Sequence, residues 1–178
     1  GRPRANSPAT EKARAIVDEV LALLVADGRR RRITFEVTTD AADAEPTVYA
    51  DRTLVAQILL NLLLNAMQAS RPGATVTIRL RRINGTGAPK TLIAVEDRGC
   101  GVESPVRMHQ FVPFYTTKPE GTGLGLWSCS RIAQEIDSQL ALYPRHRGGA
   151  RVSLLVPAKA VAATEDIERR LECPTATY

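Results

Sequence analysis

Three side-chain amides, Gln57, Asn61 and Asn65, recur at four-residue spacing within an otherwise apolar segment. Residues four apart lie one above another in a helix, so a helix here would place these amides on one face. An asparagine offers a neutral carbonyl oxygen to a hard cation and N–H donors to a phosphate oxygen, which suits a site for Mg²⁺ and a triphosphate. The alternative is that the amides form only the solvent-facing side of the helix.

An aspartate followed by two glycines ends an alternating apolar segment, in the sequence VEDRGCG. Strand alternation places Asp97 on the same side as Ile93 and Val95, so we expect its carboxylate to point into a partly buried cavity. A buried carboxylate needs hydrogen-bond donors, and the exocyclic amine of adenine is one. Gly99 and Gly101 would let the backbone approach a flat ligand closely. The alternative is an ordinary turn that begins at an aspartate.

A long segment over about 102–122 has little regular pattern and many turn-forming residues, which is typical of a functional loop. Within its sequence FVPFYTTK, Phe111 and Phe114 would hold a closing lid against the core. The hydroxyl and ammonium groups that would face phosphates are those of Thr116, Thr117 and Lys118. Taken alone, these three residues also fit an ordinary surface loop.

Glycines at every second position lead directly into a helical pattern in the sequence GTGLGL. Such a backbone presents unpaired N–H groups and the positive end of a helix dipole to an anion. The spacing matches neither the dinucleotide-binding glycine pattern nor the phosphate loop that ends in Gly-Lys-Ser/Thr. The residues of this segment expected to support a phosphate chain are Gly121, Thr122, Gly123, Leu124, Gly125 and Leu126.

Hydrophobic periodicity predicts the elements that position these segments. Helices are expected from Ser7-Pro8 to Gly28, from Asp51 to the Arg71-Pro72-Gly73 stop, and over about 123–137. Strands are expected over 33–37, 48–50, 76–80, about 90–97, 140–143 and 151–156, with the third and fourth forming a hairpin. Because helices and strands mix without a regular β-α-β alternation, the predicted class is α+β, with helices on one face of a mixed, mainly antiparallel sheet.

Composition limits the classes of protein that fit this chain. Its 178 residues, 44% of them hydrophobic, support one main core, and no apolar run reaches the roughly 18 residues of a membrane span. The three cysteines are far apart, so neither a disulfide framework nor a zinc site is indicated. A net charge of +5 keeps a basic nucleic-acid-binding module as a competing interpretation, but a solvated or partner-facing basic surface is favoured because aromatic residues are few.

The order of the four segments closely resembles that of the GHKL ATPase superfamily, which includes gyrase-type and chaperone ATPases and the histidine kinases. Asn61 and Asn65 match its asparagine box, and Asp97, Gly99 and Gly101 match its first glycine box. The segments 111–118 and 121–126 match its phenylalanine box and second glycine box. The stretches QILLNLLLNAMQAS and FVPFYTTKPEGTGLGL look most like the nitrogen-regulatory class of sensor histidine kinases, and the resemblance covers roughly residues 11 to 157.

This resemblance implies a Bergerat-type two-layer α/β sandwich that binds ATP and Mg²⁺. By position, Asn65 would be the Mg²⁺ ligand, Asn61 would assist on the phosphate side, and Asp97 would bind adenine. Lys118, together with Thr116 and Thr117, would contact the terminal phosphates. Backbone support for the triphosphate would come from Gly123, Leu124, Gly125 and Leu126.

Two departures from relatives refine the expected activity. ATP-hydrolysing members of the superfamily carry a glutamate base one helical turn before the metal-binding asparagine, where this chain has Asn61. An amide cannot accept that proton, so transfer to a nucleophile other than water is favoured. Histidine kinases also carry an acceptor histidine on a long dimerisation helix, whereas His109 lies in the expected lid and His146 lies between two strands. Both histidines are therefore interpreted as incidental.

The expected organisation follows from that missing acceptor. We expect a connector helix over 1–30 after an absent dimerisation domain, an ATP-binding domain over 31–157 and a tail over 158–178. The expected partners are the dimerisation domain of the same kinase and, through the full-length protein, a response regulator, with no nucleic acid. The fragment is expected to be a cytoplasmic monomer, although its parent could be membrane-anchored. A serine kinase of the anti-sigma type or a nucleotide-binding switch stays open as an alternative.

Overall fold

The computed structural model describes residues 7–40, 45–84, 87–102, 111–114, 123–146 and 148–159. Its strands are β1 (Ala9–Lys12), β2 (Thr34–Thr39), β3 (Thr47–Ala50), β4 (Thr75–Ile83), β5 (Lys90–Glu96), β6 (Gln139–Pro144) and β7 (Ala150–Pro157). Its helices are α1 (Ala13–Arg31), α2 (Arg52–Ala69) and α4 (Gly125–Glu135). Within those ranges, none of the helices combines the length and apolar character needed to cross a membrane.

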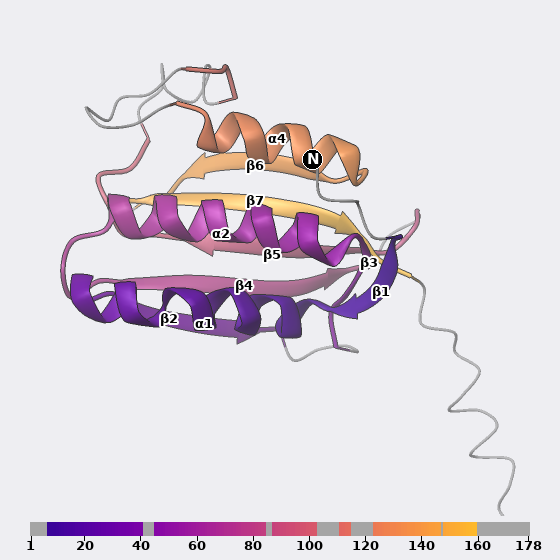
Figure 1. The fold of residues 1–178 in the computed structure, drawn as a ribbon, viewed down its shortest axis with the longest axis horizontal. Helices are drawn as coiled ribbons and strands as arrows, with labels where there is room; N and C mark the ends of the chain where they lie inside the picture. The colour runs from indigo at the N-terminus through magenta and orange to yellow at the C-terminus, as the bar shows by residue number, and fades with distance from the viewer. Residues whose placement is uncertain are drawn as a thin grey trace, which may run out of the picture.

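Five strands form the main sheet in the order β2-β4-β5-β7-β6, and β1 and β3 form a small separate sheet. The β2–β4 pair is parallel, whereas β4–β5, β5–β7 and β6–β7 are antiparallel. Helices α1, α2 and α4 lie side by side over one face of the main sheet (Figure 1). The predicted α+β class, the mixed and mainly antiparallel sheet and the central hairpin are therefore confirmed.

The core lies between the helices and the sheet because each element is apolar on one side. In α2, Ile58, Leu59 and Leu62 are each exposed by 1% or less. In β4, Ile78 is buried while the next residue, Arg79, is exposed, as the two-residue period of a strand requires. On the helix-free face, charged residues such as Glu96 and Arg151 lie beside apolar ones such as Leu92 and Leu155.

The N-terminal helix does not begin and end where the sequence suggested. Residues 9–12 form β1, which pairs with β3 in antiparallel register, and the helix begins only at Ala13. Gly28 does not end it; the last turn continues to Arg31, and Arg32 caps it in the left-handed conformation with φ 55°. A Cβ at Gly28 would lie 3.0 Å from Cε2 of Phe35, so this glycine provides close packing space for the aromatic ring. The expected entry at Ser7-Pro8 and exit at Gly28 are both wrong.

The first turn of α2 and the buried face of α1 are each defined by specific contacts. Asp51 caps α2 as predicted, since its side chain accepts a hydrogen bond from the Thr53 backbone N–H at 2.8 Å. On α1, Ile16 and Val20 are buried in the same hydrophobic cluster as α2 and the sheet. The boundary placed after residue 30 stays a prediction.

Candidate functional site

The last turn of α2 is a meeting point of segments that lie far apart in the sequence. Asn65 and Ala69 are one helical turn apart on this helix. A Cβ at Gly125, the first residue of α4, would lie 3.6 Å from Nδ2 of Asn65. A Cβ at Gly99, just after β5, would lie 2.1 Å from the carbonyl oxygen of Ala69. The structure therefore brings the asparagine, aspartate and second glycine motifs to the same end of α2.

The asparagines of the amide stripe face α4. The Cys129 thiol, in the middle of α4, lies beside the Asn61 side chain and donates to the Ile58 carbonyl at 3.9 Å, and Asn65 lies against Gly125 one turn earlier on that helix. Both asparagines are half-buried, whereas Gln57 and Gln68 are exposed. The alternative interpretation, that these amides only face solvent, therefore holds for Gln57 and Gln68 and not for the two asparagines.

Cys129 provides a test of this helix contact. Burial raises the pKa of the Cys129 thiol to about 12, against a smaller opposing effect of the neighbouring Asn61 side chain. Since a thiol reacts as its thiolate, about one Cys129 in 10,000 is ionised at pH 8. We expect iodoacetamide to alkylate Cys129 at least about tenfold more slowly than the exposed Cys100 at this pH. Peptide mass spectrometry over time measures both rates, and equal rates in the folded domain would contradict the packing.

The two carboxylate oxygens of Asp97 differ in the hydrogen bonds that they accept from the described residues. The residue is 6% exposed. Its Oδ1 accepts hydrogen bonds from the backbone N–H of Gly99 at 2.8 Å and of Ala150 at 3.2 Å. Within the described part of the chain, no group donates to Oδ2. A carboxylate held in this way presents a fixed acceptor to a ligand amine.

The turn between β6 and β7 fixes the backbone of Asp97. The Asp97 N–H donates to the carbonyl of Ala150 at 3.0 Å, and the Arg145 guanidinium donates from Nη1 to the Asp97 carbonyl at 2.8 Å. Gly149 has φ +87°, and a Cβ there would lie 2.1 Å from the Asp97 carbonyl oxygen. Only glycine fits such a close approach in this conformation. Sequence reasoning missed this support, and the Gly148-Gly149 pair between two strands was the available signal.

A buried carboxylate next to Asp97 was also missed. Glu96 is 1% exposed and lies on the opposite face of the sheet from Asp97, because consecutive strand residues alternate. Its carboxylate lies 3.1 Å from Arg79, 3.3 Å from Arg145 and 2.7 Å from Arg151. Among the described residues Oε1 accepts no hydrogen bond, so its contacts with Arg79 and Arg151 are ion pairs.

The remaining predicted site residues divide into described and undescribed positions. Gly123, with φ +68°, and Leu124, the N-cap of α4, lead into the helix, and Gly101 adopts φ +84° beside Gly149. In the expected lid, Phe111 is half-buried while Phe114 is 76% exposed, so only the first of these rings is partly buried. The predicted residues outside the described ranges are His109, Thr116, Thr117, Lys118, Gly121 and Thr122.

Residues 50–160 match the family described as histidine kinase-, DNA gyrase B-, and HSP90-like ATPase. The matched range contains the asparagine stripe, the Asp97 turn and the start of α4. Among solved structures, the catalytic domain of histidine kinase ThkA has a TM-score of 0.76 and 27% identity, covering 86% of this chain and 97% of that one. Full-length ShkA in complex with AMPPNP has a TM-score of 0.72 and 25% identity, covering 86% of this chain and 32% of that chain.

Curated relatives include a histidine-protein kinase and a transport sensor protein. The histidine-protein kinase AtoS of Escherichia coli (strain K12) is 35% identical over 88% of this chain, and the C4-dicarboxylate sensor protein DctS of Rhodobacter capsulatus is 40% identical over 66% of it. The chain spans 25% of the length of AtoS and 18% of that of DctS. The chain thus belongs to the histidine kinase-, DNA gyrase B- and HSP90-like ATPase family, with the fold and sequence of the ATP-binding catalytic domain of a sensor histidine kinase.

Proposed function

We propose that this domain binds ATP with Mg²⁺ and donates the γ-phosphoryl group to a histidine on a separate dimerisation domain of the same kinase. One observation carries the proposal: the last turn of α2 contacts both the Asp97–Gly99 segment and the start of α4. A nucleotide bound at this end would meet an adenine-binding carboxylate and a phosphate-binding helix start at the same time.

The described residues suggest an orientation for the nucleotide. Oδ2 of Asp97 would accept a hydrogen bond from the exocyclic amine of adenine, because Oδ1 is already occupied by two backbone N–H groups. Gly125 begins α4, where unpaired N–H groups and the positive end of the helix dipole favour phosphate. Asn65, beside Gly125, would then lie on the phosphate side. The predicted contacts of Thr116, Thr117, Lys118, Gly121 and Thr122 with the terminal phosphates belong to the same proposal.

The residues present fit a magnesium ion bound jointly with phosphates. In the described ranges, no group of three or more His, Cys, Asp or Glu residues is arranged to hold a metal ion. Mg²⁺ commonly keeps several waters and binds through one or two protein oxygens together with substrate phosphates. The side-chain oxygen of Asn65 would be that protein ligand. When bound, the ion would neutralise charge on the phosphate chain.

The environment of Asn61 favours transfer over hydrolysis. This residue stands where ATP-hydrolysing relatives carry the glutamate base, and its side chain lies beside the Cys129 thiol. An amide in that position cannot accept a proton from water. Phosphoryl transfer instead depends mainly on positioning the acceptor and neutralising charge, which a docked dimerisation domain and a bound metal ion would provide.

The proposal predicts a specific phosphorylation product. Incubating this domain with γ-labelled ATP, Mg²⁺ and a separately expressed dimerisation domain should label that partner with phosphate that is stable to alkali and labile to acid. Asn65→Ala should reduce the labelling rate by about 100-fold or more, because it removes the metal ligand. Gln57→Ala, an exposed amide on the same helix, should stay within about twofold of wild type.

Other outcomes of this experiment would overturn the proposal in defined ways. Label that is stable to acid and labile to alkali would indicate a serine kinase of the anti-sigma type. ATP binding without any label in the partner would indicate a nucleotide-binding switch. Equal rates for Asn65→Ala and Gln57→Ala would remove Asn65 from its role.

The wider context of the domain is also part of the proposal. Histidine kinase ThkA, whose structure in complex with response regulator TrrA has a TM-score of 0.70 and 25% identity to this chain, supports a response regulator as the eventual phosphate acceptor. That acceptor would be reached through the full-length protein. We propose a cytoplasmic location for the domain and a monomeric state when it is separated from the dimerisation domain.

A further inference from the structure

The helix-free face of the sheet carries a positively charged cluster that the proposed kinase activity does not use. Glu96, the last residue of β5, is surrounded by Arg79, Arg145 and Arg151. Arg98 lies two residues after the end of β5. Three guanidinium groups pair with this one carboxylate, so the ion-pair cluster itself carries an excess of two positive charges. Such an excess attracts anions to this face.

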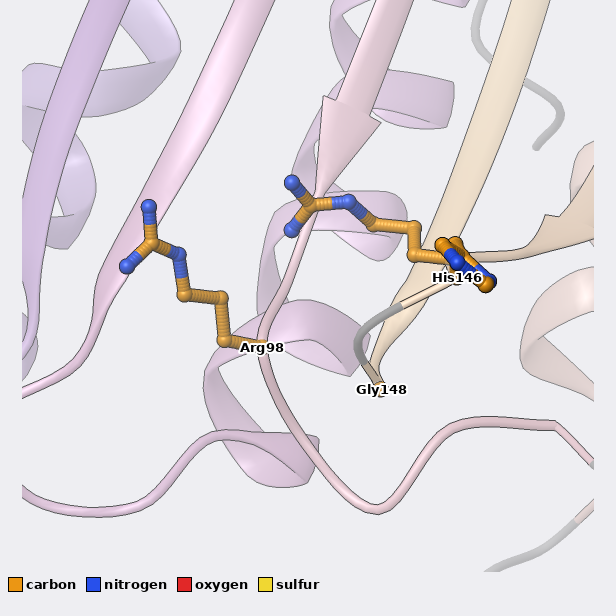
Figure 2. A pocket seen from close by; sticks show the side chains of 4 residues that line it. Arg98, His146 and Gly148 are labelled. Atoms are coloured by element: carbon orange, nitrogen blue, oxygen red, sulfur yellow. The ribbon is translucent and has the colours of Figure 1, made fainter.

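A hollow opens within this cluster. It has a volume of about 460 Å³ and is lined by Arg98, Arg145, His146 and Gly148. Figure 2 shows Arg98 on one side of the hollow and His146 with Gly148 on the other, with the helices behind the strands. A hollow of this size accommodates a small molecule. The described residues of its lining provide guanidinium and imidazole groups.

Hydrogen-bond donors in the hollow remain available to a ligand. A guanidinium has five N–H donors, and Arg145 uses Nη1 for the Asp97 carbonyl and Nη2 for Glu96. Arg98 is exposed and forms no hydrogen bond or ion pair with any other residue that the structure describes. Gly148 has φ +84° and contributes no side chain to fill the space.

We propose that this hollow is a second anion site, which binds a small phosphate-bearing molecule. Arg98 and Arg145 come from different segments, and guanidinium groups match phosphate oxygens in pairs. A phosphate group has enough oxygens to accept hydrogen bonds from more than one donor that lines the hollow, whereas a planar carboxylate presents fewer. This hollow lies on the helix-free face of the sheet, whereas the proposed nucleotide site lies between the sheet and the helices α2 and α4. The proposal therefore does not depend on the proposed kinase activity.

His146 provides a direct reading of occupancy by nuclear magnetic resonance. His146 lines the hollow, so an anion bound there changes the surroundings of its ring. We expect inorganic phosphate, added to the whole domain, to shift the His146 ring resonances saturably, and by more than chloride does at equal ionic strength. Comparison with His146→Asn assigns the signal and separates it from that of His109.

Two arginine variants separate a defined site from general attraction. Arg98→Gln should weaken the phosphate effect on His146 by about fivefold or more. Arg81→Gln removes an exposed charge of β4 that does not line the hollow, and it should leave the effect within about twofold. The proposal is overturned if phosphate shifts His146 no more than chloride does, or if both variants change the effect equally. Circular dichroism of the variants checks that each is folded.

Discussion

Replacing Asp97 by asparagine should weaken ATP binding by about 100-fold or more while leaving the domain folded. The two backbone N–H groups that hold Asp97 both donate to Oδ1, at 2.8 and 3.2 Å. An asparagine oxygen can keep both of these bonds. The amide nitrogen then takes the place of Oδ2 and turns a donor toward the adenine amine, which is itself a donor. Two opposed donors in a buried site lose affinity without loss of fold.

Isothermal titration calorimetry with a non-hydrolysable ATP analogue measures this change, and thermal unfolding measures the fold. Asp18→Asn is the matched control, since Asp18 is an exposed carboxylate on α1 that pairs with Arg14. The control should bind nucleotide as wild type does. Unchanged affinity in Asp97→Asn would remove this residue from adenine binding, whereas loss of the folded state would show that Oδ2 has a structural role.

The second large effect is expected at Gly149. A Cβ there would lie 2.1 Å from the Asp97 carbonyl oxygen and 2.8 Å from the Arg98 Cα, and the residue has φ +87°. The atoms that it would meet belong to the backbone, so they cannot rotate away. We expect Gly149→Ala to lower the free energy of unfolding by about 3 kcal/mol, from left-handed strain and overpacking together. Urea denaturation followed by circular dichroism measures this loss.

Three other glycines separate the two causes. Gly73 has φ +88° with no atom within 4 Å of its Cβ position, so Gly73→Ala should cost about 1 kcal/mol from conformation alone. Gly99→Ala should cost about 2 kcal/mol from its 2.1 Å approach to the Ala69 carbonyl oxygen. Gly87 has open space and no positive φ, and it should tolerate alanine. A loss at Gly149 no larger than that at Gly73 would contradict the close approach.

The sequence predicted most of the fold because most elements are specified locally. The periodicity of α2 and its Asp51 cap, and the alternation of β4 and β5, lie within single segments and needed no distant partner. The N-terminal error had the opposite cause. Residues 9–12 are a strand only because β3 pairs with them from almost forty residues away. Gly28 was interpreted as the end of the helix because its actual role, close packing against Phe35, is a tertiary contact that the local sequence does not reveal.

The residue types in each motif were enough to predict the candidate site residues, but the contacts around them depend on the register of the strands. Asn65, Asp97 and Gly125 stood out because amides, carboxylates and glycines are unusual in their local patterns. Nothing local connected Glu96 to Arg151, which becomes its neighbour through the antiparallel register of β5 and β7. The sequence therefore gave candidate ligand-binding residues without the cross-strand contacts that hold them.

The hydrogen bond from Arg145 to the Asp97 carbonyl makes the two surfaces of the sheet interdependent. Arg145 holds the backbone carbonyl of Asp97 from the helix-free face of the sheet, whereas the side chain of Asp97 faces the helices. A compound that captured the Arg145 guanidinium would release one restraint on Asp97 without entering the space where ATP is expected. An inhibitor that acted through Arg145 would therefore not need to compete with ATP for its site.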